Sequence, residues 1–496
     1  MIALSVSEVL AATHGRWDPG TAAAESDPTA AGRDPATIAI TGEVRIDSRS
    51  CGQGDLFVAL PGEHTDGHDF AAAAHRAGAV AVVTVRAIPQ VPCVVVADPV
   101  IALGALAKAV LARLPELVIV GITGSSGKTS TKDLIGELLS GWGATVCPIG
   151  SYNNDLGVPL TALRVEPATR YLVLEMGSRG IGHIARLTQI ARPAIGVVLN
   201  IGTAHLGEFG SAAVVATAKS ELVAALPAAG DGGVAILNAD DPATPYLAGR
   251  TAAQVWTFGS APGADIRYDG IDLSIGGRPR FRLSAGAGQV EVALRLVGAH
   301  QAANASAAAA VALATVARDR PPARVTSAAT DQRLTEIGIG LGHALPRSRW
   351  RMELTDRADG VSILNDAYNA NPESMRAALD ALTAVAGGDR RTWAVLGAMG
   401  ELGNQAAAEH EAVGHEIRRR GVDRLVAVGA DAAGIYAGAA GGPAEEEGFI
   451  HVPDMSAALQ LLRSQLRSGD VVLVKASRYV GLERLADALL AEADLT

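Results

Sequence analysis

The run from Gly121 to Thr129, Gly-Ile-Thr-Gly-Ser-Ser-Gly-Lys-Thr, combines small residues with a lysine and a hydroxyl in a pattern suited to phosphate chemistry. An apolar stretch precedes it at 117–120, and a helical pattern follows at 132–139. A glycine-rich turn between a strand and a helix start presents backbone N–H groups and the positive end of the helix dipole to phosphate oxygens. Lys128 is expected to reach the β- and γ-phosphates, and the Thr129 hydroxyl to ligate Mg²⁺. The run therefore predicts an ATP site.

Three further residues that could carry chemistry lie at a strand end, in a loop and on a helix after this run. Glu175 ends the strand 171–174 and is expected near the phosphate loop, where a carboxylate can hold Mg²⁺; a strand-end acid facing solvent is the alternative. His205 lies in the loop after the next apolar strand and would offer an imidazole to a second cation, with a surface or capping histidine as the alternative. Lys219 lies on the following helix, and by itself it is typical of an exposed helical lysine.

Polar groups also gather later in the chain. His300 and Asn304 are one helical turn apart on one face, and an asparagine amide suits an adenine edge, although helix capping remains open. The run 365–374, Asn-Asp-Ala-Tyr-Asn-Ala-Asn-Pro-Glu-Ser, ends a strand and starts a helix. Its density of amides and carboxylates indicates a ligand site, with turn-forming Asn and Asp as the alternative. Lys475 and Arg478 place two cations at the end of the last strand.

The elements that position these residues predict an α/β protein of three domains, at 1–113, 114–345 and 346–496. The first is a small module with expected strands near 37–40, 55–60, 79–83 and 93–96 and helices near 69–77 and 101–114. The second is a parallel sheet with strand ends at Glu175, Asn200 and Asn238, followed by a strand at 291–297 and an alanine-rich helix. The third alternates four strands with helices, one of which begins at Asn371-Pro372, an N-cap followed by proline.

Composition excludes several classes of protein. Among 496 residues the net charge is −10, which argues against a nucleic-acid surface. No segment reaches the roughly 18 apolar residues needed to cross a bilayer, and the N-terminus lacks the pattern of an export signal. The three cysteines, Cys51, Cys93 and Cys147, have neither metal nor disulfide spacing. A reduced, cytoplasmic protein without membrane or nucleic-acid partners is expected.

With these residues in view, the whole chain resembles the Mur ligases, ATP-dependent amide-forming enzymes of peptidoglycan precursor synthesis. Residues 123–129 resemble the nucleotide loop of that family, whose form accounts for glycine at 124 where the usual P-loop pattern has it at 122. Within the family, the run 366–372, Asp-Ala-Tyr-Asn-Ala-Asn-Pro, resembles the branch that adds D-alanyl-D-alanine to UDP-N-acetylmuramoyl-tripeptide. The sister enzymes that add glutamate or a diamino acid carry different residues there.

Shorter segments extend the resemblance. Residues 47–49 and 66–70 are similar to the N-terminal, UDP-binding module of that branch. Residues 151–154 and 157–159 are similar to its loop after the second central strand. The resemblance implies a UDP-binding domain, a central P-loop ATPase domain and a C-terminal Rossmann-like domain. It also implies a ligase that couples the dipeptide to the tripeptide carboxylate through an acyl-phosphate, which yields the pentapeptide precursor of peptidoglycan. A monomer is expected.

The roles of single residues follow from the resemblance. Its cofactors are ATP, two Mg²⁺ ions and a CO₂-derived carbamate on Lys219, which requires a locally neutral amine. Catalytic roles are implied for Lys128, His205, Lys219 and Arg351, with Arg349 as a substitute for Arg351. The implied metal ligands are Thr129, Glu175, His205 and Lys219. The residues implied at ATP are Gly124, Ser125, Ser126, Gly127, Lys128, Thr129, Ser130, His300, Asn304, Arg351 and Asp366, the last of them at the ribose.

The residues implied at the two other substrates are Ser48, Arg49, Asp66, Gly67, His68, Asn153, Asn154, Tyr368, Asn369, Asn371, Ser374, Lys475 and Arg478. One departure is Ala476, where the family often has glycine, which weakens the assignment of Arg478. Two alternatives remain. One is another ligase of the superfamily, such as the diamino-acid-adding enzyme or folylpolyglutamate synthase. The other is a nucleotide-dependent binding module that has lost ligation.

Overall fold

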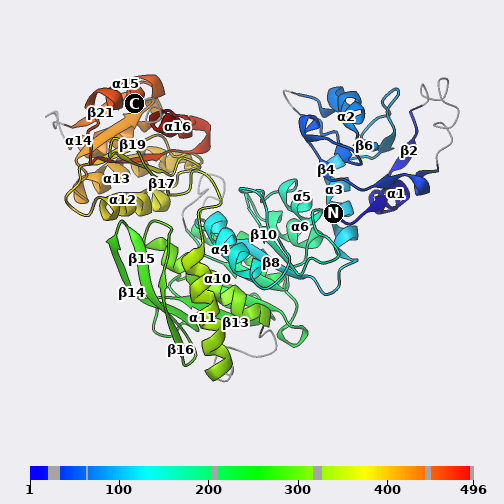
Figure 1. The fold of residues 1–496 in the computed structure, drawn as a ribbon, viewed down its shortest axis with the longest axis horizontal. Coiled ribbons are helices and arrows are strands. Elements are labelled where there is room, and N and C mark those ends of the chain that lie inside the picture. The colour runs from blue at the N-terminus through cyan, green and yellow to red at the C-terminus, as the bar shows by residue number, and fades with distance from the viewer. Residues whose placement is uncertain (21–33, 63–64, 203–210, 317–326, 442–447, 492–496) are drawn as a thin grey trace. The chain divides into compact units, whose positions relative to one another are not determined.

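The computed structural model describes residues 1–20, 34–62, 65–202, 211–316, 327–441 and 448–491 (Figure 1). His205, for which a metal-binding role is predicted, lies outside the described residues, as does the predicted helix break at 318–322. The chain divides into two compact units. One comprises Met1–Gly121, Trp142–Gly177 and Ile184–Ala194, and the other comprises Ile122–Gly141, Ser178–His183 and Ile195–Thr496.

A five-stranded sheet forms the N-terminal part of the first unit. Its strand order is β2 (Arg16–Asp18), β7 (Cys93–Val95), β6 (Ala81–Thr84), β5 (Leu56–Val58) and β4 (Val44–Arg45). All neighbours are parallel except β2 and β7. The helices are α1 (Val6–Thr13), α2 (Ala71–Ala77) and α3 (Pro99–Leu111), and the short strands β1 (Leu4–Ser5) and β3 (Ala39–Ile40) pair antiparallel. The predicted small α/β module is thus present, with element ends shifted by a few residues.

The second sheet has nine strands, in the order β16 (Gly288–Ala293), β15 (Arg278–Ala285), β14 (Ile266–Ile275), β13 (Gln254–Gly259), β12 (Val234–Asn238), β11 (Ile195–Val198), β8 (Val118–Thr123), β10 (Tyr171–Glu175) and β9 (Thr145–Val146). The strand predicted at 291–297 is β16, which begins and ends earlier. Strand β11 also ends two residues before Asn200.

Antiparallel pairing of β14 with β15 and of β15 with β16 extends this sheet, whereas an all-parallel sheet was expected. The reason is visible in β15, where buried and exposed residues alternate, as in a sheet with one solvated face. Glycines with positive φ, at Gly276, Gly277 and Gly286, make the turns between these strands. The fold remains an α/β architecture with an antiparallel extension.

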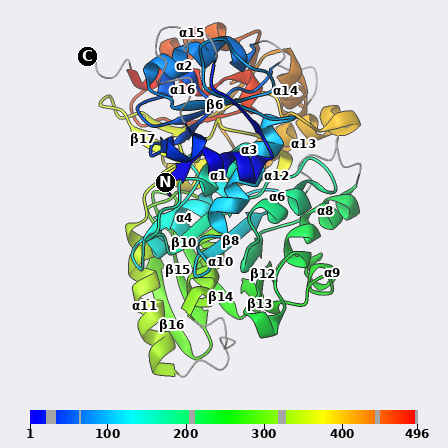
Figure 2. The same cartoon turned by 90° about the vertical axis from the view of Figure 1, so that its right-hand side faces the viewer.

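The helices that accompany this sheet are α4 (Lys128–Ser140), α5 (Gly157–Ala162), α6 (His183–Ile190), α8 (Ala212–Ala224), α9 (Thr244–Ala248), α10 (His300–Val316) and α11 (Ser327–His343). Helix α10 is rich in alanine and almost wholly buried, and it packs against α4, β13 and β14. Small side chains allow that close approach. Helix α11, which was not predicted, runs beside β15 and β16 (Figure 2).

A third sheet has the order β17 (Glu353–Asp356), β18 (Ser362–Asn365), β22 (Val471–Lys475), β19 (Thr392–Leu396), β20 (Arg424–Val428) and β21 (Phe449–Val452), parallel except for β17. Helices α12 (Pro372–Ala386), α13 (Ala406–Arg419) and α14 (Ala433–Ala440) share one core with it, and α15 (Met455–Gln465) and α16 (Glu483–Ala491) share the other (Figure 1). Since β18 and β22 are neighbours, the segments that follow them, including 366–371 and 476–478, meet at one sheet edge.

Among the described residues, no helix combines the length and apolar character that crossing a bilayer requires.

Candidate active site

The phosphate loop has the predicted strand–turn–helix form. Strand β8 ends at Thr123, and α4 begins at Lys128. Gly127 caps the helix with a φ of 80°, and a Cβ there would stand 2.6 Å from Asn304 Oδ1. The Lys128 ammonium donates to the Gly124 carbonyl at 2.6 Å, which ties the side chain to its own loop. The loop is therefore a narrow turn that requires glycine at its helix end.

Asn200 braces this loop. Its Oδ1 accepts the backbone N–H groups of Ser125 and Ser126 at 2.8 and 2.9 Å, and its Nδ2 donates to Ser126 Oγ at 3.1 Å. From the sequence, Asn200 is predicted only to end a strand. Its position just beyond β11, the neighbour of β8, was the signal that could have assigned it to the loop.

Replacement of Gly127 with alanine is expected to weaken ATP binding about tenfold or more, because a strained left-handed residue and a collision with Asn304 both displace the loop. Equilibrium titration with ATP and Mg²⁺ checks this. Gly150 to alanine is the matched control, since it also has positive φ but nothing lies within 4 Å of a Cβ there. Equal loss in both variants would contradict the role given to the Asn304 contact.

Arg351 reaches the phosphate loop from the segment before β17. Its Nη2 donates to Thr129 Oγ1 at 3.2 Å, and its guanidinium lies 4.0 Å from the centroid of the Tyr368 ring. Among the described residues, Arg351 Nε is buried and finds no hydrogen-bond partner. The flanking residues Trp350 and Met352 both have positive φ, 60° and 52°. Strain of this kind persists only where the surroundings hold it, and it is common at functional sites.

Lys219 is buried, with 3% of its surface exposed, so the expectation of an exposed lysine from sequence context alone was wrong. The reason is its register in α8: Val215, Lys219, Leu222 and Val223 follow the spacing of a buried helical stripe. Burial, with a smaller contribution from Lys128, lowers the pKa of Lys219 to about 7, while Glu373 opposes the shift. A substantial fraction of this amine is therefore neutral near pH 7.

Glu373 was not assigned a role from sequence. It lies in the first turn of α12, and a Cβ on Gly202 would stand 2.1 Å from one of its carboxylate oxygens. Its charge also acts on Lys219. The Glu373 side chain therefore faces the loop that follows β11. This contact joins segments that are far apart in the sequence, so sequence patterns do not indicate it.

Glu175 lies in the first unit, buried at the end of β10. Its Oε1 accepts from Ser151 Oγ and Asn153 Nδ2, both at 2.8 Å. Asn154 Oδ1 accepts the backbone N–H of Gly157 at 2.9 Å and so orders the start of α5. The segment that resembles the family's loop after the second central strand thus holds Glu175 through the side chains of Ser151 and Asn153.

The polar residues of the N-terminal module form local pairs. Arg49 binds Asp47 at 2.7 Å, and its hydrogen bonds lower the pKa of Asp47 to about 2. His68 is buried, pairs with Asp66 through Nδ1, and accepts the Val85 N–H on Nε2 at 3.4 Å. The side chain of His68 therefore supports the fold at this loop, and its contact with a substrate stays a prediction, as do those of Ser48 and Gly67.

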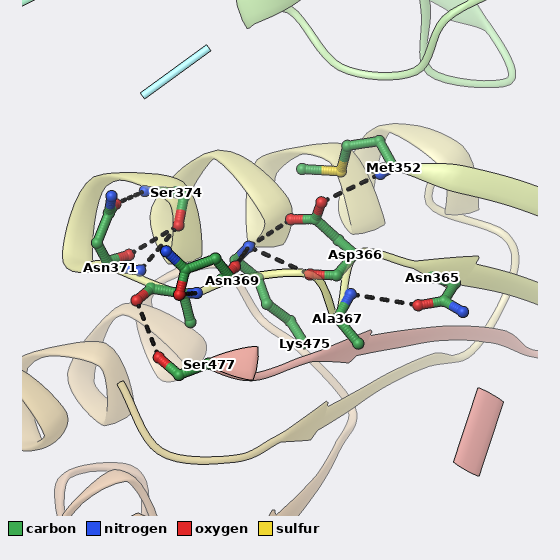
Figure 3. Close-up of polar contacts among 10 residues, drawn as sticks. Met352, Asn365, Asp366, Ala367, Asn369, Asn371, Ser374, Lys475 and Ser477 are labelled. Atoms are coloured by element: carbon green, nitrogen blue, oxygen red, sulfur yellow. Dashed lines mark hydrogen bonds and ion pairs between the residues drawn. The ribbon is translucent and has the colours of Figure 1, made fainter. Parts of the chain in front are cut away.

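The run after β18 is anchored from β22 (Figure 3). The Lys475 ammonium is buried, pairs with Asp366 and donates to the Asn369 carbonyl at 2.8 Å. Asn371 and Ser374 form a capping box at the start of α12, which confirms the predicted N-cap. Most of these polar groups therefore shape the loop itself.

Two predicted binding residues have partners of their own. Arg478 pairs with Glu483 at 2.9 Å and lies 4.4 Å from the centroid of the Trp350 ring. Asn304 Nδ2 donates to Gln301 Oε1 at 2.9 Å, on the same helix. The Oδ1 atom of the same amide lies next to Gly127. Desolvation lowers the pKa of His300, one turn earlier on α10.

The second unit thus brings together Lys128, Thr129, Lys219, Asn304 and Arg351 around one loop. Glu175 and the polar residues of the N-terminal module belong to the first unit. Within the part of the chain that the structure describes, no group of three His, Cys, Asp or Glu residues could by itself hold a metal ion.

Comparison with protein families gives three matches. The model described as the Mur ligase middle domain matches residues 122–312, the Mur ligase glutamate ligase domain matches 350–478, and the Mur ligase family catalytic domain matches 41–111.

Individual proteins agree with these matches. UDP-N-acetylmuramoyl-tripeptide--D-alanyl-D-alanine ligase of Mycobacterium tuberculosis (strain ATCC 25618 / H37Rv) is 44% identical, over 99% of this chain and 98% of its own. The ligase of the same name from Escherichia coli (strain K12) is 36% identical, over 90% and 93%. A crystal structure of MurF from Acinetobacter baumannii has a TM-score of 0.82 at 30% identity and covers 99% of both chains. That of MurF ligase from Thermotoga maritima in complex with ADP has a TM-score of 0.76 at 28% identity, over 92% of this chain and 99% of its own. This chain therefore belongs to the Mur ligase family.

Proposed function

We propose that this chain joins D-alanyl-D-alanine to the terminal carboxylate of UDP-N-acetylmuramoyl-tripeptide at the expense of ATP. The observation that carries the proposal is a phosphate loop contacted by Arg351 and flanked by a buried, partly neutral Lys219. The identity of 44% to relatives that bear this activity in their name supports the choice of substrates. The Asp366–Pro372 run, by resemblance, supports the dipeptide over glutamate or a diamino acid.

The first step joins two anions. The substrate carboxylate attacks the γ-phosphorus of ATP, the bond to the β-phosphate oxygen breaks, and an acyl-phosphate and ADP result. Repulsion between the two anions is large in a cleft of low dielectric constant. Lys128 and Arg351 are the cations of this chain that offset it, Lys128 from the loop and Arg351 through a guanidinium whose buried Nε still has a proton to donate. In the second step the dipeptide amine, as the free base, attacks the acyl carbon and phosphate leaves.

Mur ligases depend on ATP and typically on Mg²⁺, which supplies further positive charge beside the phosphates. Thr129, Glu175, His205 and Lys219 would hold it, with Lys219 carrying a CO₂-derived carbamate. The burial of Lys219 supports this part of the proposal. CO₂ adds only to a neutral amine, and burial lowers the pKa of Lys219 to about 7. We also propose that two Mg²⁺ ions bind. The chain would act on small molecules as a cytoplasmic monomer and bind neither nucleic acid nor membrane.

The division of labour among domains is part of the same proposal. Residues 1–113 would bind the UDP-substrate, residues 114–345 would bind ATP, and residues 346–496 would present the dipeptide through Tyr368, Asn369 and Asn371. Closure of the third domain during the reaction would keep water from the acyl-phosphate.

Phosphate release from the purified chain with ATP, Mg²⁺ and UDP-N-acetylmuramoyl-tripeptide tests the function. We expect release with D-alanyl-D-alanine, and none with glutamate or diaminopimelate, and a product whose mass corresponds to the pentapeptide. Release with another acceptor would indicate a different ligase of the superfamily. ATP binding without release for any acceptor would indicate a binding module.

A further inference from the structure

Lys475, at the end of β22, is buried with 1% of its surface exposed. Its ammonium pairs with Asp366 Oδ2 and donates to the Asn369 carbonyl at 2.8 Å and to the Asp366 carbonyl at 3.4 Å. All three contacts belong to one loop, the segment that follows β18 (Figure 3). An ammonium has three protons to donate, so these contacts use its full capacity.

The other carboxylate oxygen of Asp366 contacts a different segment of the chain. Asp366 Oδ1 accepts the backbone N–H of Met352 at 3.1 Å (Figure 3). Met352 has a φ of 52°, and the residue before it is Arg351, which contacts Thr129. The carboxylate therefore holds in place the strained backbone from which Arg351 extends.

The acceptor loop depends on the same strand end. Lys475 fixes the Asn369 carbonyl, and Ser477 Oγ, two residues further on, donates to the Ala370 carbonyl at 3.3 Å. Asn371 then caps α12. The resemblance implies that the side chains of Asn369 and Asn371 lie near the dipeptide. The backbone that carries them is thus fixed by hydrogen bonds from Lys475 and Ser477, at and just after the end of β22.

We infer that Lys475 is a positioning residue. Through its buried contacts with Asp366 and Asn369, it keeps the Arg351 side chain directed toward the triphosphate and the loop 366–371 directed toward the acceptor. This role differs from the direct substrate contact that the resemblance implies for Lys475. It rests on the proposed function only for the identity of the acceptor.

The geometry gives a reason for this arrangement. Phosphoryl transfer to an oxygen of the substrate carboxylate and amide formation at its carbon follow one another at the same carboxyl group. Arg351, which serves the first step, and the loop that serves the second must therefore keep a fixed spacing. A buried ammonium maintains this spacing, because it bonds to the Asn369 carbonyl and to Asp366, whose other carboxylate oxygen accepts the Met352 N–H. Burial lowers the pKa of Lys475, and the Asp366 carboxylate opposes that shift and favours the charged form.

The test is Lys475→Met, which keeps length and burial but removes the charge and all three donors. We expect amide hydrogen exchange to become about tenfold or more faster in both 350–352 and 366–371, because both segments lose their anchor. We also expect the dissociation constant for ATP with Mg²⁺ and the KM for the dipeptide to rise together by a similar factor.

Arg391→Met is the matched control. Arg391 binds Asp470 at 2.6 Å, and Trp393 Nε1 donates to the same carboxylate. This pair lies where β19 and β22 begin, at the end of β22 opposite to Lys475. Its loss should lower the melting temperature but leave exchange in the two segments and the ATP constant within about twofold. Should Lys475→Met not fold, Lys475→Arg retains the charge, and its bulkier planar group should produce the same two exchange changes.

Three outcomes would overturn the inference. A rise in the dipeptide KM alone, with ATP affinity and exchange at 350–352 unchanged, would mean that Lys475 contacts the substrate. Equal effects in Arg391→Met would mean general destabilisation. Unchanged exchange in both segments would mean that Lys475 anchors neither. The proposed function fails separately, if the unaltered chain forms no product from the dipeptide, because the exchange readout requires no substrate.

Discussion

Lys219→Ala is expected to lower the rate of ligation by about 10²–10³-fold, since it removes one charge-stabilising group from the phosphate site. Short-chain carboxylic acids such as acetate should restore part of the lost rate, because an added carboxylate can occupy the space left by the side chain and replace the carbamate. Phosphate release at saturating substrates, measured against acid concentration, is the readout.

Lys219→Met serves as the control for this rescue. Methionine has nearly the length of lysine and fills the buried site in α8, so that no acid can enter. We expect the same loss of activity as in Lys219→Ala and no recovery with acid. Full activity of either variant would exclude Lys219 from the mechanism, and equal recovery in both would assign the rescue to another site.

The chemistry of the phosphate loop could be predicted because it is local. A strand, a glycine-rich turn and Gly127-Lys128-Thr129 at a helix start lie next to each other in sequence, and the structure has that order. The N-cap at Asn371 was predicted for the same reason, since a capping residue and the following proline act on their own helix.

What sequence reasoning missed depends on contacts between distant segments. Asn200 and Glu373 face the loops near residues 125 and 202 only after the sheets have formed. Sequence context alone predicts an exposed Lys219 because a charged residue usually prefers water, yet its place in the apolar stripe of α8 buries it. The contacts of Lys475 with Asp366 likewise require β22 to lie beside β18, an order that the sequence does not state.

The antiparallel strands β14 to β16 show a different limit. In β15, the alternation of polar and apolar residues was present in the sequence, but the repeated α/β pattern before it favoured parallel pairing. Period-two alternation with glycine turns is the better guide to pairing direction, because a strand buried on both faces does not alternate.

Arg351→Ala is expected to lower the rate by about 10²–10³-fold and to raise the KM for ATP, because the guanidinium is the cation that extends from the segment before β17 to the phosphate loop. Arg351→Lys should not restore the rate. A lysine cannot both stack on the Tyr368 ring and reach Thr129, whereas the planar guanidinium does so in the structure. Steady-state kinetics with varied ATP separates the effect on KM from that on kcat.

Two neighbouring arginines make this prediction specific. Arg347 pairs with Glu137 at the surface of the same segment, and surface pairs contribute little, so Arg347→Ala should leave the rate within about twofold. Arg349 lies over Trp350 and pairs with Asp487 at 3.3 Å, away from the loop. If Arg349→Ala abolishes activity while Arg351→Ala retains it, the two residues exchange roles, and the contact with Thr129 does not serve catalysis. A loss confined to Arg351→Ala would tie the strained backbone at Trp350 and Met352 to the phosphate site, since that backbone is what directs the guanidinium toward Thr129.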